Sequence, residues 1–282
     1  MSSKNSSNPI EENRWKSRWS AAGYQYPARR ISHGADWQKA RLLASDVDSR
    51  AYGHFAEPGL FGLDCFDAMV SAGHDIDGYI FLSQSLSLHR LPRLDEALSL
   101  CGTVEELTPV PRGMMARECY QFLDASGKLC LETHLIGIVE PLGDALSDDA
   151  IGHMPVREQA PADGWTMIGE KQITPEKVIA FSKDVGNDLH FDPEMAQHYG
   201  FRAPLAQGVM TVVYLLSALS ENTIPSGFKA QVDFLRPVFW DSTATLWIHG
   251  KDHGPSDTVW VQSRNEENKA TANLIVKQLS YD

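Results

Sequence analysis

The stretch that decides the fold is residues 181–210, which reads FSKDVGNDLHFDPEMAQHYGFRAPLAQGVM. Asp192 followed by Pro193 predicts a helix start, because an aspartate caps the first amides and proline suits the first helical position. Gly200 then predicts the end of this short helix. His190 is therefore expected in the connection that comes just before a helix.

A second helix is expected from about Gly208 to Leu219, where the side chains are apolar nearly all round. Such a helix must be buried, and we expect a curved sheet to wrap it. The first amides of a helix lack partners within it, and glycine lets a ligand approach the backbone. The free N–H groups of Gly208 and Val209, with the helix dipole, would suit a carbonyl oxygen that gains negative charge.

The order of elements repeats along the chain. Leu60, Leu63, Phe66 and Val70 recur at three- and four-residue steps, which predicts a mostly buried helix within 58–73. Strands are expected at 82–88, about 97–107, 115–123 and 128–138, with a hairpin turn at 124–127. A helical block at 175–220 and strands at about 228–236, 243–250, 257–264 and 270–278 then follow.

This repetition predicts one module duplicated, on element order alone, because the two sequences are not obviously similar. Residues 141–164 contain Pro, Gly, Asp and Ala without periodicity and form the best linker candidate. We therefore expect a loose, flexible arm at 1–30, a first domain at 31–140, this linker, and a second domain at 165–282.

Composition limits the function. The 282 residues are 43% hydrophobic and 22% charged, which indicates a globular protein of one large or two ordinary domains. The net charge of −12 argues against nucleic acid as a partner. No apolar run predicts a membrane span, and the polar N-terminal residues lack the core of a signal peptide, so we expect a cytoplasmic protein.

The cysteines predict no metal site. Cys65, Cys101, Cys119 and Cys130 form no CxxC pair and have no histidine at metal-binding spacing. Because each lies among apolar neighbours in the sequence, we expect buried free thiols.

Residues in the second half carry a family resemblance. The matching positions are Gly186, Leu189, His190, Asp192, Pro193, Ala196, Pro204, Gly208 and Met210, together with the later stretch 234–241, FLRPVFWD. In these residues the chain resembles the MaoC-like hotdog proteins, which include (R)-specific enoyl-CoA hydratases and 3-hydroxyacyl thioester dehydratases. The resemblance covers roughly residues 165–278 at motif level, and the first half in element order only.

The resemblance implies an α+β protein with two hotdog folds (a double hotdog), in each of which an antiparallel sheet wraps a long helix. It also implies a hydro-lyase of the kind used in fatty acid metabolism, which hydrates a 2-enoyl thioester or dehydrates a 3-hydroxyacyl thioester. The substrate would be carried by coenzyme A or an acyl carrier protein, with no metal or redox cofactor. The two modules resemble an internal dimer, and a homodimer of such chains is a further option.

The chain also departs from the family pattern. Val185 stands where the family has its catalytic aspartate, and Gln207 stands where it usually has histidine. A carboxylate partner for His190 must therefore come from Asp184 or Asp188, if it exists at all. The predicted catalytic residues are His190, Asp188, Asp184, Asn187 and Gly208. The predicted substrate-binding residues are Leu205, Gln207, Val209, Arg202 and Arg236, the two arginines as partners for coenzyme A phosphates.

Plainer interpretations stay open for these residues. His190 is either a general acid/base or a polar residue hydrogen-bonded beside a helix cap. Asp188 either orients His190 and its water or is simply solvated, and Asp192 is interpreted as a cap alone. Two other functions also remain: an acyl-thioester hydrolase, or another lyase or isomerase, on the same fold, and a non-catalytic acyl-binding module.

Overall fold

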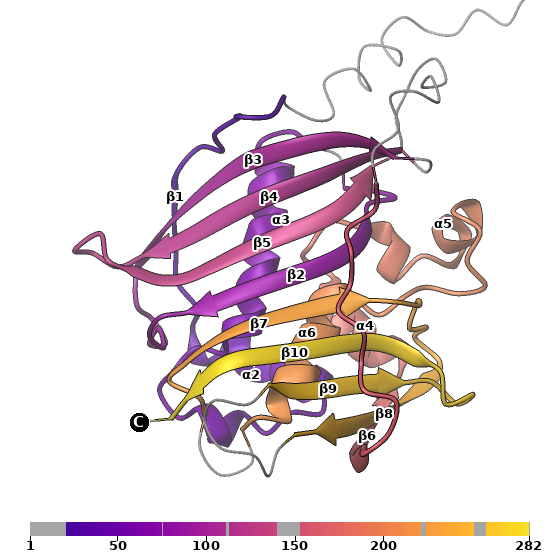
Figure 1. The fold of residues 1–282 in the computed structure, drawn as a ribbon. Helices are drawn as coiled ribbons and strands as arrows, with labels where there is room; N and C mark the ends of the chain where they lie inside the picture. The colour runs from indigo at the N-terminus through magenta and orange to yellow at the C-terminus, as the bar shows by residue number, and fades with distance from the viewer. Residues whose placement is uncertain are drawn as a thin grey trace, which may run out of the picture.

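The computed structural model describes residues 21–74, 76–110, 113–139, 153–220, 224–250 and 258–281. Its strands form one antiparallel ten-stranded sheet, in the order β1-β3-β4-β5-β2-β7-β10-β9-β8-β6 (Figure 1). The first five strands are β1 (Arg29–Ile31), β2 (Ile80–Leu88), β3 (Leu98–Val110), β4 (Gly113–Leu123) and β5 (Leu129–Val139). The others are β6 (Thr166–Ile173), β7 (Gly227–Phe234), β8 (Ser242–His249), β9 (Val259–Arg264) and β10 (Ala270–Ser280).

The two halves of the sheet share one strand order. The first half runs β1-β3-β4-β5-β2, and the second, followed inward from its own edge, runs β6-β8-β9-β10-β7. They join where β2 pairs antiparallel with β7, from Ser83 opposite Asp233 to Leu88 opposite Phe228. The expected α+β architecture is therefore confirmed, and the sheet is continuous across the junction.

Each half wraps its sheet around one central helix. These are α3 (Phe61–Ser71) and α6 (Gly208–Ser217), which lie behind the sheet in Figure 1. On the predicted stripe of the first helix, Leu60, Leu63 and Phe66 are buried, but Val70 is 39% exposed at its last turn. In α6 every residue from Val209 to Leu216 is buried, as the apolar sequence requires.

Other helices complete the inner layer. They are α2 (Ala35–Ala44), α4 (Pro175–Ser182) and α5 (Pro193–His198), with the short 3-10 turns η1 (Ser49–Tyr52), η2 (Pro58–Leu60) and η4 (Asp188–His190). Helix α2 packs against α4. Sequence periodicity missed α2 because its buried face includes the polar residues Gln38 and Arg41, and it also missed strand β6. In the described part of the chain, no helix is long and apolar enough to cross a membrane.

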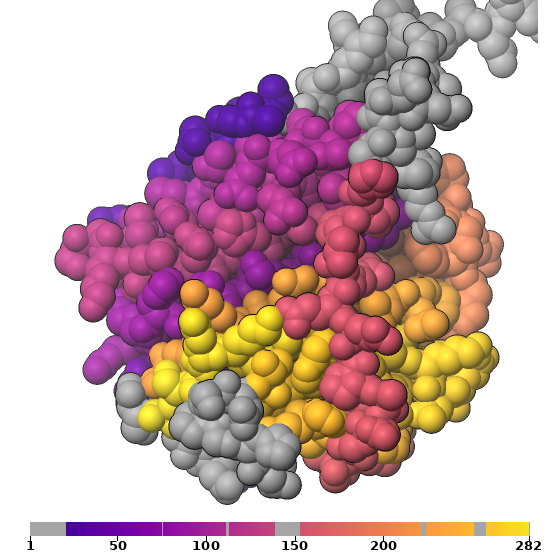
Figure 2. Space-filling view, viewed as in Figure 1, coloured from indigo at the N-terminus to yellow at the C-terminus, as the bar shows by residue number. Residues whose placement is uncertain are grey.

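A strap crosses the outer face of the sheet. Residues 153–165 run over the junction between the halves before they enter β6 (Figures 1 and 2). The Arg157 guanidinium donates to the Phe234 carbonyl at 2.9 Å, and Glu158 forms an ion pair with Lys277. The strap is the second part of the predicted linker; residues 140–152 and the first twenty residues of the predicted arm lie outside the described residues.

Candidate active site

His190 lies in the turn η4, between helices α4 and α5. Asn187 holds the start of this turn, because its Oδ1 accepts the Leu189 N–H at 3.1 Å. Asp192 caps α5 by accepting the Glu194 N–H at 2.8 Å, with Pro193 at the first helical position. The predicted cap is confirmed, and it fixes His190 directly before the helix.

The imidazole of His190 is buried and neutral. The residue is 9% exposed, and its Nδ1 lies 2.9 Å from the Leu205 carbonyl oxygen. Because a carbonyl can only accept, Nδ1 carries the hydrogen and Nε2 keeps its lone pair. Burial lowers the pKa of His190 from 6.5 to about 4, and the bond to Leu205 opposes this in part. The side chain is thus prepared to act as a base.

The loop between α5 and α6 holds the imidazole and leads to the start of α6. Leu205, which holds the imidazole, comes three residues before Gly208 in the sequence. The Val209 N–H was expected to be free, but it donates to Gln207 Oε1 at 2.8 Å. No residue in the described ranges accepts a hydrogen bond from the Gly208 N–H. Gln207 therefore acts as the N-cap of the helix, and one leading amide remains available.

Two aromatic side chains lie against this helix start. A Cβ atom on Gly208 would lie 2.5 Å from Cδ1 of Phe81 and 3.4 Å from Cζ of Phe234. The two rings pack together with their centroids 4.7 Å apart. Phe81 belongs to β2 of the first half, so the site includes residues from both halves. Sequence reasoning missed both aromatics, because only the pairing of β2 with β7 brings them together.

The loop before β2 also contributes to the site. The Asn187 Nδ2 donates to the Ile76 carbonyl at 3.2 Å. Gly78 lies against Tyr199 so closely that a Cβ there would be 2.5 Å from the tyrosine ring. Asn187, a predicted catalytic residue, is thus engaged on both sides and positions the His190 turn against the first half.

The structure does not bring either predicted carboxylate to His190. Asp184 is half exposed and forms an ion pair with Arg41 of helix α2. Asp188 is exposed at the start of η4. Val185, at the position of the family's aspartate, is buried with an exposure of 7%. Among the described residues, therefore, no hydrogen bond joins a carboxylate to this imidazole.

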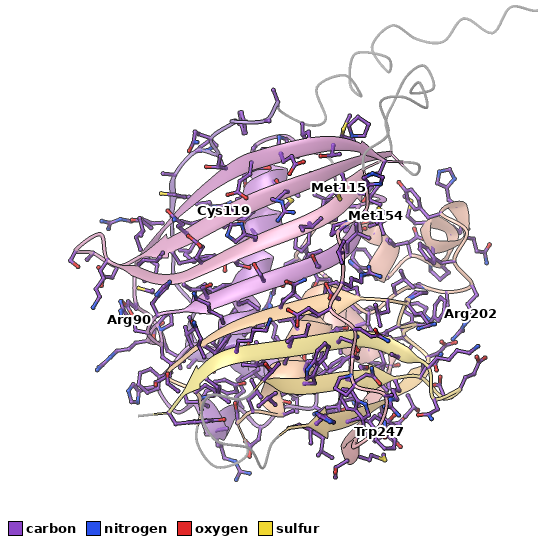
Figure 3. The ribbon with its side chains drawn as sticks, in the orientation of Figure 1. Arg90, Met115, Cys119, Met154, Arg202 and Trp247 are labelled. Carbon is purple, nitrogen blue, oxygen red and sulfur yellow. The ribbon has the colours of Figure 1, made fainter. Side chains whose placement is uncertain are left out.

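The two predicted phosphate-binding arginines are already engaged. Arg202 makes a double hydrogen bond with Asp241, at 2.7 Å for each oxygen, and lies 4.0 Å above the Phe239 ring. It borders a cleft of about 240 Å³ whose lining includes Glu266 and Glu267, an acidic surrounding that disfavours phosphate. Arg236 donates to the Ala270 carbonyl at 2.5 Å. Arg202 lies at the outer edge of the second half (Figure 3), and both arginines donate to oxygens of the protein itself.

Comparison with known proteins supports the fold. No family model and no curated protein sequence matches the chain. Its solved neighbours include HtdX from Mycobacterium tuberculosis, at 17% identity and a TM-score of 0.70, covering 89% of this chain and 98% of that one. A MaoC-like dehydratase from Phytophthora capsici has 17% identity and a TM-score of 0.71, with 90% and 95% covered.

A conserved hypothetical protein of M. tuberculosis, described as having a double hotdog fold, has 14% identity and a TM-score of 0.64, with 93% and 97% covered. The chain thus has the double hotdog fold, as predicted. The resemblance to MaoC-like proteins is confirmed at the level of the fold. Thioesterases share this fold as well: an acyl-ACP thioesterase from Bacteroides thetaiotaomicron has 8% identity and a TM-score of 0.56, with 91% and 97% covered.

Proposed function

We propose that this chain is a hydro-lyase that adds water to a 2-enoyl thioester and removes it from a 3-hydroxyacyl thioester. The observation that carries the proposal is the neutral, buried imidazole of His190, held by Leu205 on the loop that leads to the Gly208 N–H, for which the described residues provide no acceptor. The MaoC-like dehydratases among its structural neighbours support the same chemistry. The substrate is an acyl thioester on coenzyme A or an acyl carrier protein.

In the dehydration direction, the Gly208 N–H and the dipole of α6 stabilise the thioester oxygen as it gains negative charge. His190 Nε2 takes a proton from C2, and the C2–H electron pair moves into the thioester to give its enolate. As this pair returns to form the C2–C3 double bond, the C3–O bond breaks, and the hydroxyl leaves as water with the proton that His190 returns. One imidazole serves both steps, since no hydrogen bond joins it to a carboxylate among the described residues. The thioester itself acidifies the C2 hydrogen, so we propose no metal or redox cofactor for this step.

Thioester hydrolysis is the second candidate. Val185 replaces the aspartate that would hold the water of a hydratase, and a thioesterase shares the fold. In that reaction Nε2 would take a proton from a water that attacks the carbonyl carbon. The C–S bond would then break and release the thiol.

An assay with crotonyl-CoA separates these functions. We expect the full chain to remove the conjugated double bond without releasing free thiol, and His190→Ala to lower kcat/KM by about 10²- to 10⁴-fold, the usual contribution of an acid–base group. The exposed His198, on α5, supplies the control variant His198→Ala, for which activity should be retained. Thiol release would support hydrolysis instead, and binding without either reaction would support a non-catalytic module.

A further inference from the structure

A second group of reactive side chains lies on the outer face of the first half, on strands β3, β4 and β5. Cys119 and His134 face each other directly across the β4–β5 pair. Glu105 lies beside them on β3, at a register shift between Val104 and Glu106. Thr103 pairs with Cys119, and residues two apart on a strand share a face, so Glu105 lies on the same face as Cys119. Figure 3 shows Cys119 on this part of the sheet, on the opposite side of the view from Arg202.

The donor atoms of these residues lie close together. One oxygen of Glu105, the Cys119 Sγ and one His134 nitrogen all lie within 4.8 Å of one another. His134 Nδ1 is 3.2 Å from Glu105 Oε2. A tetrahedral zinc site with bonds of about 2.0–2.3 Å sets its donor atoms roughly 3.3–3.8 Å apart. The donor atoms of the cluster therefore lie slightly farther apart than in a site that holds zinc. The side chains are exposed or half-buried, so small rotations can bring the donor atoms to the distances that zinc requires.

A supporting layer surrounds the histidine. His134 Nε2 lies 3.4 Å from Glu132 Oε1. The other oxygen of that carboxylate, Oε2, accepts a hydrogen bond from Gln121 Nε2 at 2.8 Å. A metal-binding histidine usually gives its second nitrogen to a carboxylate, which orients the ring and strengthens the ligand. One nitrogen of His134 thus faces Glu105 and Cys119, while the other is oriented by an anchored carboxylate.

We propose that Glu105, Cys119 and His134 bind one divalent ion of the zinc class, with Glu132 as the residue that positions His134. Sulfur, imidazole and carboxylate donors together suit Zn²⁺, and the exposed location leaves a fourth position for water. This site is separate from the proposed reaction at His190.

The charges of the cluster favour a cation. The carboxylates of Glu105 and Glu132 lie 3.2 and 3.4 Å from the two ring nitrogens of His134. Their negative charges attract a cation to this part of the sheet.

Titration of the untagged full chain with Co²⁺ tests the site. We expect one ion per chain and a thiolate-to-cobalt charge-transfer band, which Zn²⁺ abolishes by competition. Cys119→Ser should lose the band, and His134→Gln should weaken binding by at least about tenfold. Cys101→Ser is the matched control, because Cys101 is also partly exposed on β3 but outside the cluster. It should behave as the unmodified chain does.

A further variant tests the positioning role. Glu132→Gln should keep the band but weaken affinity about 10- to 100-fold, the usual effect of removing a partner of a metal ligand. A Co²⁺ band that survives in Cys119→Ser, or the lack of saturable one-to-one binding in the unmodified chain, would overturn the proposal. If Cys119→Ser fails to fold, the His134→Gln result decides alone. Hydration of crotonyl-CoA is measured in parallel, and its presence or absence does not bear on this site.

Discussion

Two buried titratable residues of this protein have opposite shifts in pKa. Burial lowers the pKa of His190 and raises that of Glu57 to about 8. Glu57 is fully buried just before η2, where its Oε2 accepts the Leu60 N–H at 2.9 Å and its Oε1 has no partner within the described residues. Both groups are held in their neutral forms, since burial penalises a charge.

Glu57 predicts a loss of stability as the pH rises from 4.5 to about 8. The folded pKa of about 8 lies above the ordinary value of 4.5, so the folded state binds more protons than the unfolded state in this window. The contribution is complete below pH 4.5 and is lost as the pH rises towards 8, by about 1.4 kcal/mol per pH unit. Glu57→Gln should remove this dependence. Its unfolding free energy, compared with that of the unmodified chain at the same pH, should therefore be more favourable at pH 8 than at pH 5.

Urea unfolding at several pH values measures this effect. Glu118, whose pKa is raised to about 7 chiefly by burial, gives a smaller dependence of the same sign that remains in the variant. A Glu57→Gln chain with an unchanged pH profile would show that Glu57 is ionised in the folded state.

Substitutions at Gly208 and Phe81 are expected to have coupled effects on the unfolding free energy. Gly208→Ala places a Cβ atom 2.5 Å from the Phe81 ring, and such overpacking costs about 1–3 kcal/mol of unfolding free energy. Phe81→Leu in the same chain should recover part of that loss by making room. Urea denaturation of the two single variants and the double variant measures the coupling; strictly additive effects would contradict the contact.

At the scale of elements, a polar side chain caps a helical segment next to each central helix. Glu57 caps the turn η2, which runs into α3, and Gln207 caps α6 itself. A polar residue at a helix start can either cap the helix or bind substrate. From the sequence we expected Gln207 to bind substrate, whereas in the structure it caps α6. The start of α5, with Asp192 as its cap and Pro193 at the first helical position, was predictable because it depends on local sequence only.

The Asp192 cap gives a prediction at this scale. Asp192→Ala removes the acceptor of the Glu194 N–H and should lower the unfolding free energy by about 0.5–2 kcal/mol. Asp192→Asn keeps an acceptor oxygen and should lose much less. Thermal unfolding of both variants measures the difference, and equal losses would mean that the carboxylate charge, not the cap, stabilises α5.

At the scale of the whole molecule, the two halves share one sheet and one hydrophobic core. The core cluster joins residues such as Phe61 of α3 to Tyr214 of α6 and Val232 of β7. We therefore expect a single cooperative unfolding transition, with equal calorimetric and van't Hoff enthalpies. Two separate transitions in differential scanning calorimetry would contradict this.

Sequence patterns predicted the repeated element order but not the contacts that complete the sites. Periodicity reports which face of a helix or strand is buried, and it is silent about partners distant in the chain. The approach of Phe81 to Gly208 depends on the β2–β7 pairing, and that of Cys119 to His134 on the β4–β5 register. Likewise the engagement of Asp184 by Arg41 required helix α2, which carries no clear apolar stripe.

The pH dependence of kcat/KM with a 2-enoyl thioester shows whether His190 is the catalytic base. If the buried, neutral imidazole of His190 is the base, activity stays constant from pH 8 down to about 5 and falls only as the pH approaches its pKa of about 4. A fall centred near 6.5, the ordinary value for histidine, would place the reacting imidazole in solvent and contradict the account.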